Sequence, residues 1–66
     1  MNLVVNGAPY LHGGQGTIAE LLAEWRLAPP MTAVMINGEV IRRSQWEPVR
    51  LSEGDRVELI VAAAGG

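Results

Sequence analysis

Residues 56–66 of the chain read Arg-Val-Glu-Leu-Ile-Val-Ala-Ala-Ala-Gly-Gly. The first six of them alternate in polarity, with the period of two that is typical of a half-buried β-strand. This alternation predicts that Val57, Leu59 and Val61 face the core and that the side chains between them face outward. The end of the chain is therefore expected to be a strand with one buried face.

Five small residues, 62–66, follow this strand, and none of them has a side chain large enough to anchor it. We therefore expect one domain over residues 1–61 and a flexible C-terminal tail over residues 62–66. The tail ends in Gly65 and Gly66, which lack Cβ atoms and let an extended backbone enter a narrow channel. A pair of glycines at a chain end is uncommon by chance, at about one chain in 200 from average glycine usage.

Two Asn-Gly dipeptides, at 6–7 and 37–38, predict two β-hairpins. This dipeptide suits a two-residue turn in which both residues have positive φ. Pro9 has no backbone N–H to donate to a neighbouring strand, so its strand is expected at an edge of the sheet. The four predicted hairpin strands cover residues 1–5, 8–12, 33–36 and 39–41.

Thr17 is predicted to begin the only long helix. Thr17 and Glu20 have the spacing of a capping box, in which each side chain satisfies a free backbone amide of the other. Apolar residues recur on one helical face at 18, 21, 22 and 25, which places Trp25 on the core face. The helix is expected to end by Ala28, because Pro29 disfavours the helical conformation of the residue before it.

One sheet with a single helix on one face buries the apolar surfaces of both. The predicted fold is α+β, a β-grasp (ubiquitin-like) domain with a mixed sheet of about five strands. We expect the last strand to lie in the middle of the sheet, parallel to the first, and a short turn at residues 44–48 to bury Trp46. The helix leaves the other sheet face uncovered, which predicts an exposed apolar patch and a possible partner-binding face. Its residues are Val4, Ala33, Met35 and Ile60.

The composition excludes several classes of function. The 66 residues carry a net charge of −2 and no lysine, which argues against nucleic acid as a partner. The sequence has no apolar run long enough for a membrane span and no visible signal peptide, so no membrane partner and a cytoplasmic location are expected. With no cysteine, the chain has no disulfide, thiolate metal site or persulfide of its own.

Candidate sites for chemistry inside the domain are weak. Residues 14–19 fit the G-x-G-x-x-G/A pattern of dinucleotide-binding loops, but the preceding strand belongs to a hairpin and the chain is too short for that fold. His12 has no second histidine or cysteine to complete a metal site, so it is interpreted as an ordinary strand-end side chain. Arg42 and Arg43 are interpreted as a solvated surface pair, and contact with an acidic partner or a phosphate is the alternative interpretation. We expect no catalytic residues, no metal and no cofactor bound by this chain, and thus no enzyme.

The stretch INGEVIRRSQWEPVRLSEGDRVELIVAAAGG (36–66), together with GQGTIAELL (14–22), resembles the ThiS family, the sulfur carriers of thiamine biosynthesis. The resemblance spans essentially the whole chain. It implies that the Gly66 carboxylate is adenylated by an E1-like, ThiF-type enzyme that uses ATP, with Gly65 providing clearance. It further implies that a persulfide-bearing donor converts the adenylate to a thiocarboxylate, which thiazole synthase uses to build the thiazole ring.

Three other interpretations remain open at this point. The small subunit of molybdopterin synthase shares the fold, the tail and the activation chemistry, but delivers sulfur to a pterin. A ubiquitin-like protein modifier would instead be conjugated to target lysines through Gly66. A non-covalent β-grasp interaction module would carry the tail without using it.

Overall fold

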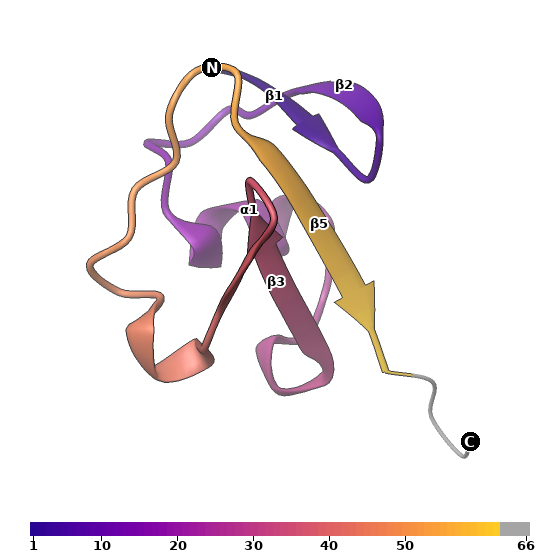
Figure 1. The fold of residues 1–66 in the computed structure, drawn as a ribbon, viewed down its shortest axis with the longest axis vertical. Helices are drawn as coiled ribbons and strands as arrows, with labels where there is room; N and C mark the ends of the chain where they lie inside the picture. Colours follow the sequence, from indigo (N-terminus) through magenta and orange to yellow (C-terminus); the bar gives the residue numbers. More distant parts are fainter. Residues whose placement is uncertain (63–66) are drawn as a thin grey trace.

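Five strands form one mixed sheet, and one α-helix packs on one of its faces (Figure 1). The computed structural model describes residues 1–62. The strands are β1 (Asn2–Val5), β2 (Ala8–Leu11), β3 (Thr32–Ile36), β4 (Glu39–Ile41) and β5 (Arg56–Val61). The helix is α1 (Ile18–Glu24), and two short 3-10 helices are η1 (Pro29–Met31) and η2 (Arg43–Gln45).

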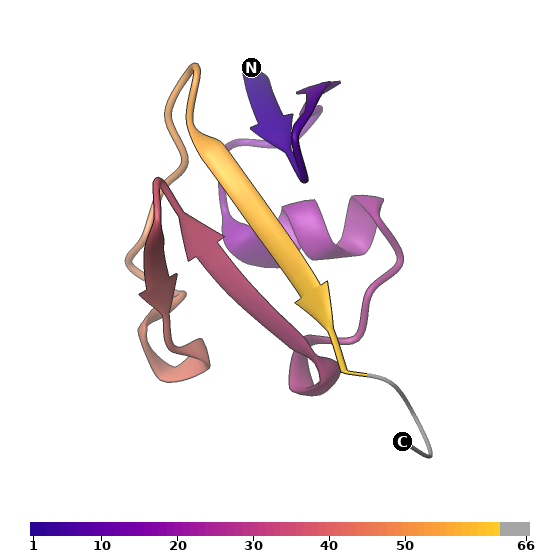
Figure 2. The same cartoon turned by 45° about the vertical axis from the view of Figure 1, so that its right-hand side comes forward.

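The strand order is β2-β1-β5-β3-β4, so the last strand lies in the centre of the sheet. It runs parallel to β1, with Val5 opposite Val57, and antiparallel to β3, with Val34 opposite Leu59. Figure 2 shows β5 between these two neighbours. The β-grasp prediction is confirmed, including the central last strand and the edge position of the strand that contains Pro9.

Both Asn-Gly turns adopt the predicted left-handed conformation. The φ angles are 51° and 83° at Asn6 and Gly7, and 51° and 84° at Asn37 and Gly38. Each asparagine also binds the central strand. The Asn6 side-chain oxygen accepts from the Leu59 amide at 2.8 Å, and that of Asn37 accepts from the Arg56 amide at 3.0 Å. The two hairpin turns therefore hold β5 from both sides.

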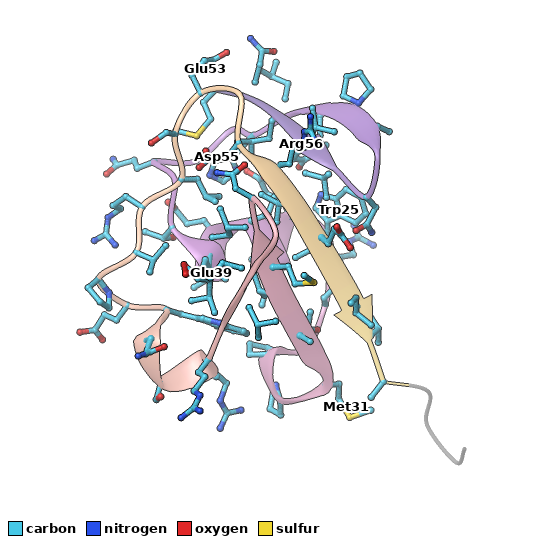
Figure 3. The ribbon with its side chains drawn as sticks, viewed as in Figure 1. Trp25, Met31, Glu39, Glu53, Asp55 and Arg56 are labelled. Carbon is cyan, nitrogen blue, oxygen red and sulfur yellow. The ribbon has the colours of Figure 1, made fainter. Side chains whose placement is uncertain are left out.

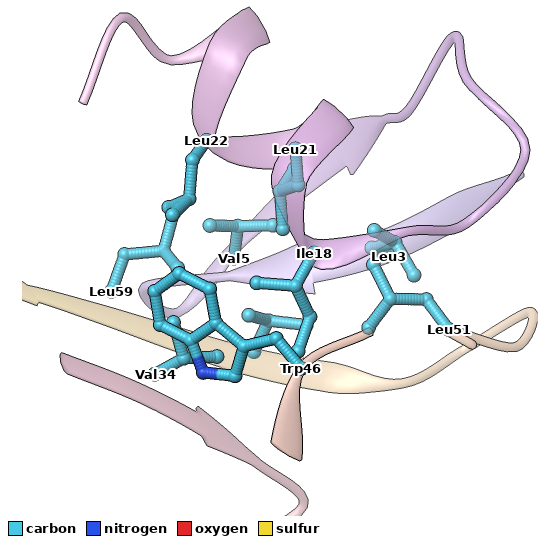
Figure 4. Close-up of a cluster of buried hydrophobic side chains, with 10 residues drawn as sticks. Leu3, Val5, Ile18, Leu21, Leu22, Val34, Trp46, Leu51 and Leu59 are labelled. Atoms are coloured by element: carbon cyan, nitrogen blue, oxygen red, sulfur yellow. The ribbon is translucent and has the colours of Figure 1, made fainter. Parts of the chain in front are cut away.

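The core lies between α1 and the sheet. The capping box forms as predicted, with the Thr17 hydroxyl accepting from the Glu20 amide and the Glu20 carboxylate accepting from the Thr17 amide. Trp46 is buried as predicted, and its indole N–H donates to the Ile41 carbonyl at 2.8 Å. Figure 4 shows this core, which consists of Leu3, Val5, Ile18, Leu21, Leu22, Val34, Trp46, Leu51, Val57 and Leu59.

Two sequence-based predictions need correction. Val61 is 50% exposed rather than buried, because α1 has only seven residues, about 10 Å of helix, and leaves the end of β5 uncovered. The second strand ends at Leu11, and His12 is buried rather than an ordinary strand-end residue. Trp25 packs against the core as predicted; it caps the end of α1, is half-buried, and its ring packs edge-on against Tyr10. None of the helices within residues 1–62 has the length and apolar composition needed to cross a membrane.

Candidate functional site

The C-terminal end of β5 is where the chain leaves the sheet. Ala62, the first residue of the predicted tail, donates its amide to the Met31 carbonyl at 2.8 Å and ties this end to η1. Figure 3 shows Met31 beside the end of β5 and Arg56 at its start. Gly65 and Gly66, the predicted site of modification, lie outside the described residues. The structure shows where the segment leading to these two glycines begins, which is the end of the central strand β5.

The uncovered sheet face carries apolar side chains near this end. Ala33 lies opposite Ile60 in the β3–β5 register, so both point to the same face, and Ile60 is 53% exposed. Met35 is half-buried on the same face. Sequence reasoning missed Val40, which is 62% exposed and lies opposite Met35. A two-residue turn at 37–38 fixes that pairing, so the hairpin signal contained enough information to find it.

Met31 is the second residue that sequence reasoning missed; it is 40% exposed at the end of η1. Val4, by contrast, lies opposite Arg56, four residues before Ile60 along β5 and so about 13 Å away. The structure therefore brings three of the four predicted face residues together and leaves Val4 apart. We call the resulting cluster the outer patch: Met31, Ala33, Met35, Val40 and Ile60.

His12 is the centre of a hydrogen-bond network on the other side of the molecule. Its Nδ1 lies 2.8 Å from a Glu24 carboxylate oxygen, and its Nε2 accepts from the Gly16 amide at 3.1 Å. Tyr10 donates its hydroxyl to the same Glu24 oxygen at 2.6 Å, and the Gly13 amide donates to the other at 2.9 Å. Both ring nitrogens of His12 are therefore used inside the fold, which gives the histidine a structural role.

This network sets the charge state of its acids. Desolvation alone would raise the pKa of Glu24, but the hydrogen bonds from Tyr10, His12 and Gly13 together hold it below its ordinary value. The pKa of Glu20 is lowered mainly by the hydrogen bond from the Thr17 hydroxyl, and further by the amides of Thr17 and Gln15. The same bond to Glu24 that stabilises the carboxylate raises the pKa of the Tyr10 hydroxyl.

The network also explains the glycine-rich loop at residues 13–16. The amides of Gly13, Gln15 and Gly16 donate to Glu24, Glu20 and His12, respectively. A phosphate-binding loop needs such amides free to bind the ligand. The structure thus supports the interpretation of this segment as a strand-to-helix connection rather than a dinucleotide site.

Together, the sheet order, the single helix and the exit of the tail from the central strand define a small β-grasp protein of the ubiquitin-like class. The model of the ThiS family matches residues 3–66. The chain therefore belongs to the ThiS family, whose members are small sulfur-carrier proteins rather than catalysts.

Two solved structures support this assignment. A crystal structure of the thiamine biosynthesis protein ThiS from Geobacter metallireducens is 35% identical, covers the whole of both chains and superposes with a TM-score of 0.79. A solution structure of a thiamine biosynthesis protein from the same organism is 35% identical and gives a TM-score of 0.81 over all of this chain and 88% of that one.

A curated relative is much longer than this chain. The thiazole synthase of Paramagnetospirillum magneticum is 30% identical over 66 residues, which is 100% of this chain but only 20% of that protein. The chain thus spans about one fifth of the length of that relative.

Proposed function

We propose that this chain is the sulfur carrier of thiamine biosynthesis, and that its Gly66 carboxylate is the group that carries the sulfur. The observation that carries the proposal is the extent of the family match, which continues to residue 66 and so includes Gly65 and Gly66. The absence of cysteine from the sequence agrees with this, because the sulfur must then travel at the chain end rather than on a side chain.

The proposed chemistry begins with adenylation. An α-carboxyl group has a pKa of about 3.3–3.7, so it is an anion at neutral pH. One carboxylate oxygen attacks the α-phosphorus of ATP on a ThiF-type, E1-like enzyme, and pyrophosphate leaves. The carboxylate carbon reacts poorly with nucleophiles. In the acyl-adenylate the same carbon is readily attacked, because AMP is a good leaving group. The activating enzyme supplies the stabilisation of the developing charge.

Sulfur transfer follows in two steps. The terminal sulfur of a persulfide on a donor protein attacks the acyl carbon and displaces AMP, which gives an acyl disulfide. A thiol then attacks the donor sulfur of this disulfide, the S–S bond breaks, and the Gly66 thiocarboxylate is released. On thiazole synthase the thiocarboxylate sulfur bonds to a carbon of the substrate; an oxygen of the substrate or of water then attacks the acyl carbon, the acyl C–S bond breaks, and the Gly66 carboxylate is regenerated.

Two observations support the choice of partners. A protein named thiazole synthase contains a stretch similar to this whole chain, as expected if carrier and synthase work together. The outer patch is exposed beside the point where the tail begins, and apolar patches of this kind are common partner sites. In the proposal, the activating enzyme and the synthase bind the outer patch while the tail reaches their active sites.

The test is intact-mass spectrometry after incubation with the ThiF-type enzyme, ATP and a sulfur donor. We expect a gain of about 16 Da, from the replacement of one oxygen by sulfur. A chain lacking Gly66, and a reaction without ATP, are the controls and should show no gain. An unchanged mass with partners that modify another ThiS-family chain would refute the proposal.

A second assay separates the thiamine from the molybdopterin pathway. The thiocarboxylate form is supplied to thiazole synthase with its substrates, and separately to the large subunit of molybdopterin synthase. We expect thiazole formation in the first reaction and no dithiolene formation in the second. The reverse pattern would reassign the carrier to molybdopterin synthesis.

A further inference from the structure

A groove on the helix-covered side of the molecule has no part in the proposed carrier chemistry. It has a volume of about 340 Å³ and lies between the start of α1 and the segment around η2. Thr17, Ile18 and Ala19 line one wall, and Arg43, Trp46 and Arg50 line the other, with Glu47 at the border. Figure 4 shows the Trp46 indole beside Ile18, and these two buried side chains give the groove an apolar floor.

The charge around this groove is opposite to that of the rest of the protein. Residues 42–50 contain three arginines and one glutamate, a net charge of +2, whereas the remainder contains two arginines and six acidic residues, a net charge of −4. Within residues 1–62 the only basic side chain at ion-pair distance from a carboxylate is His12, beside Glu24, so neither groove arginine is neutralised by a carboxylate there. An acidic protein thus presents two uncompensated guanidinium groups at one groove.

The guanidinium groups of Arg43 and Arg50 also differ in their hydrogen bonds. One terminal guanidinium nitrogen of Arg50 donates hydrogen bonds to the carbonyl oxygens of Glu47 at 2.6 Å and Val49 at 3.0 Å. These bonds fix the guanidinium near the groove. Arg43 is exposed, and its guanidinium makes no hydrogen bond within the described residues. A guanidinium group presents paired N–H donors that match a carboxylate, and one that is already oriented loses less entropy on binding.

From this combination we propose that the groove is a docking site for an acidic segment of a partner protein, in which carboxylates bind Arg43 and Arg50 and an apolar side chain packs on Ile18 and Trp46. The groove offers both arginines and an apolar floor, and an acidic peptide segment with an apolar residue fits both. A free inorganic anion would bind the arginines but leave the apolar floor unfilled. The site lies on the opposite sheet face from the outer patch, and in Figure 1 residues 42–50 and the end of β5 lie on different sides of the molecule. A partner bound here leaves the outer patch accessible.

The proposal is tested by selecting displayed random peptides on the full chain and measuring the affinity of the enriched peptides by titration. We expect peptides with at least two acidic residues near an apolar one, and binding that weakens as salt is raised. The double variant Arg43→Gln, Arg50→Gln should weaken binding at least tenfold. The control, Arg42→Gln with Arg56→Gln, removes the same charge from residues outside the groove and should change affinity less than threefold.

Two other outcomes overturn the proposal. Equal weakening by the two double variants would mean that peptides respond to overall charge and not to this groove. If millimolar inorganic phosphate displaces the peptides, and shifts the same backbone amide resonances of an ¹⁵N-labelled chain as the peptides do, the groove is a small-anion site. Because the measurement uses binding alone, its failure leaves the mass-spectrometric test of the carrier role unaffected.

Discussion

Replacing His12 by leucine should destabilise the fold strongly although His12 takes no part in the proposed chemistry. The substitution places an apolar side chain of similar size in this buried position and removes both ring nitrogens. The Gly16 amide, which is buried, then loses its acceptor. Leaving a buried donor unsatisfied costs about 1–3 kcal/mol.

The contact with Glu24 adds a smaller amount. A hydrogen bond to a charged group contributes roughly 1.5–3 kcal/mol, but the Glu24 side chain is 26% exposed, so water replaces part of the loss. The total is about 2–4 kcal/mol, a large share of the stability of a domain of this size. At about 4–8 °C per kcal/mol for such domains, the unfolding midpoint should fall by roughly 10–30 °C.

The assay is thermal and urea unfolding of the full chain followed by circular dichroism. Leu11→Ala is the matched control, because Leu11 is the adjacent residue and is 70% exposed, so its midpoint should stay within a few degrees. If His12→Leu has the same unfolding midpoint as this control, the hydrogen bonds of His12 do not stabilise the fold.

The remaining predictions concern the loop, the acids and the outer patch. Gly16→Ala should destabilise by about 2 kcal/mol or more in urea unfolding, because φ is +94° and a Cβ would lie 3.0 Å from the Leu51 carbonyl oxygen; Gly13→Ala, with no positive φ, should have a clearly smaller effect. The lowered pKa of Glu24 stabilises the fold above its ordinary value of 4.5, and this contribution is lost as pH falls through the lower folded-state pKa. The Glu24→Gln variant should therefore show a flatter decline of stability below pH 4.5 than the wild type, and an identical decline would contradict the assignment. Ile60→Ser should raise the apparent KM for the activating enzyme about fivefold with little change in unfolding, from the loss of a half-exposed apolar contact. Leu11→Ser, on the same face at the opposite corner of the sheet, should leave that KM unchanged, and equal effects of the two would argue against the outer patch.

The order and pairing of the strands could be predicted because short-range signals determine them. Each Asn-Gly turn fixes the register of its hairpin and Pro9 indicates an edge, so the central position expected for the last strand comes from the β-grasp arrangement of these hairpins. The burial of Val61 was predicted wrongly because alternation reports which face a side chain is on, whereas burial depends on how far the helix reaches.

The role of His12 could not be predicted for a different reason. Its partners, Glu24 and Gly16, lie on the helix and in the loop before it, and only the packing of α1 against the first hairpin brings them together. Glu24 lies off the helical face formed by residues 18, 21, 22 and 25. Its carboxylate nevertheless reaches back to the loop, which a pattern of apolar residues does not encode.

The attachment of the tail to β5 has a physical consequence for a carrier. Asn6 and Asn37 each accept a hydrogen bond from a β5 amide, β1 and β3 flank this strand, and Ala62 is bound to Met31. Ala62 is thus fixed at the end of the central strand, beside the outer patch. A partner that binds the patch fixes the origin of residues 63–66, and four extended residues span at most about 14 Å. In the proposed function, the distance from the patch-binding surface to the reactive centre must therefore fall within this reach in both the activating enzyme and the synthase. Lengthening the tail by two glycines before Gly65 should slow thiocarboxylate formation and leave patch binding unchanged, whereas an equal rate would show that the tail does not position Gly66.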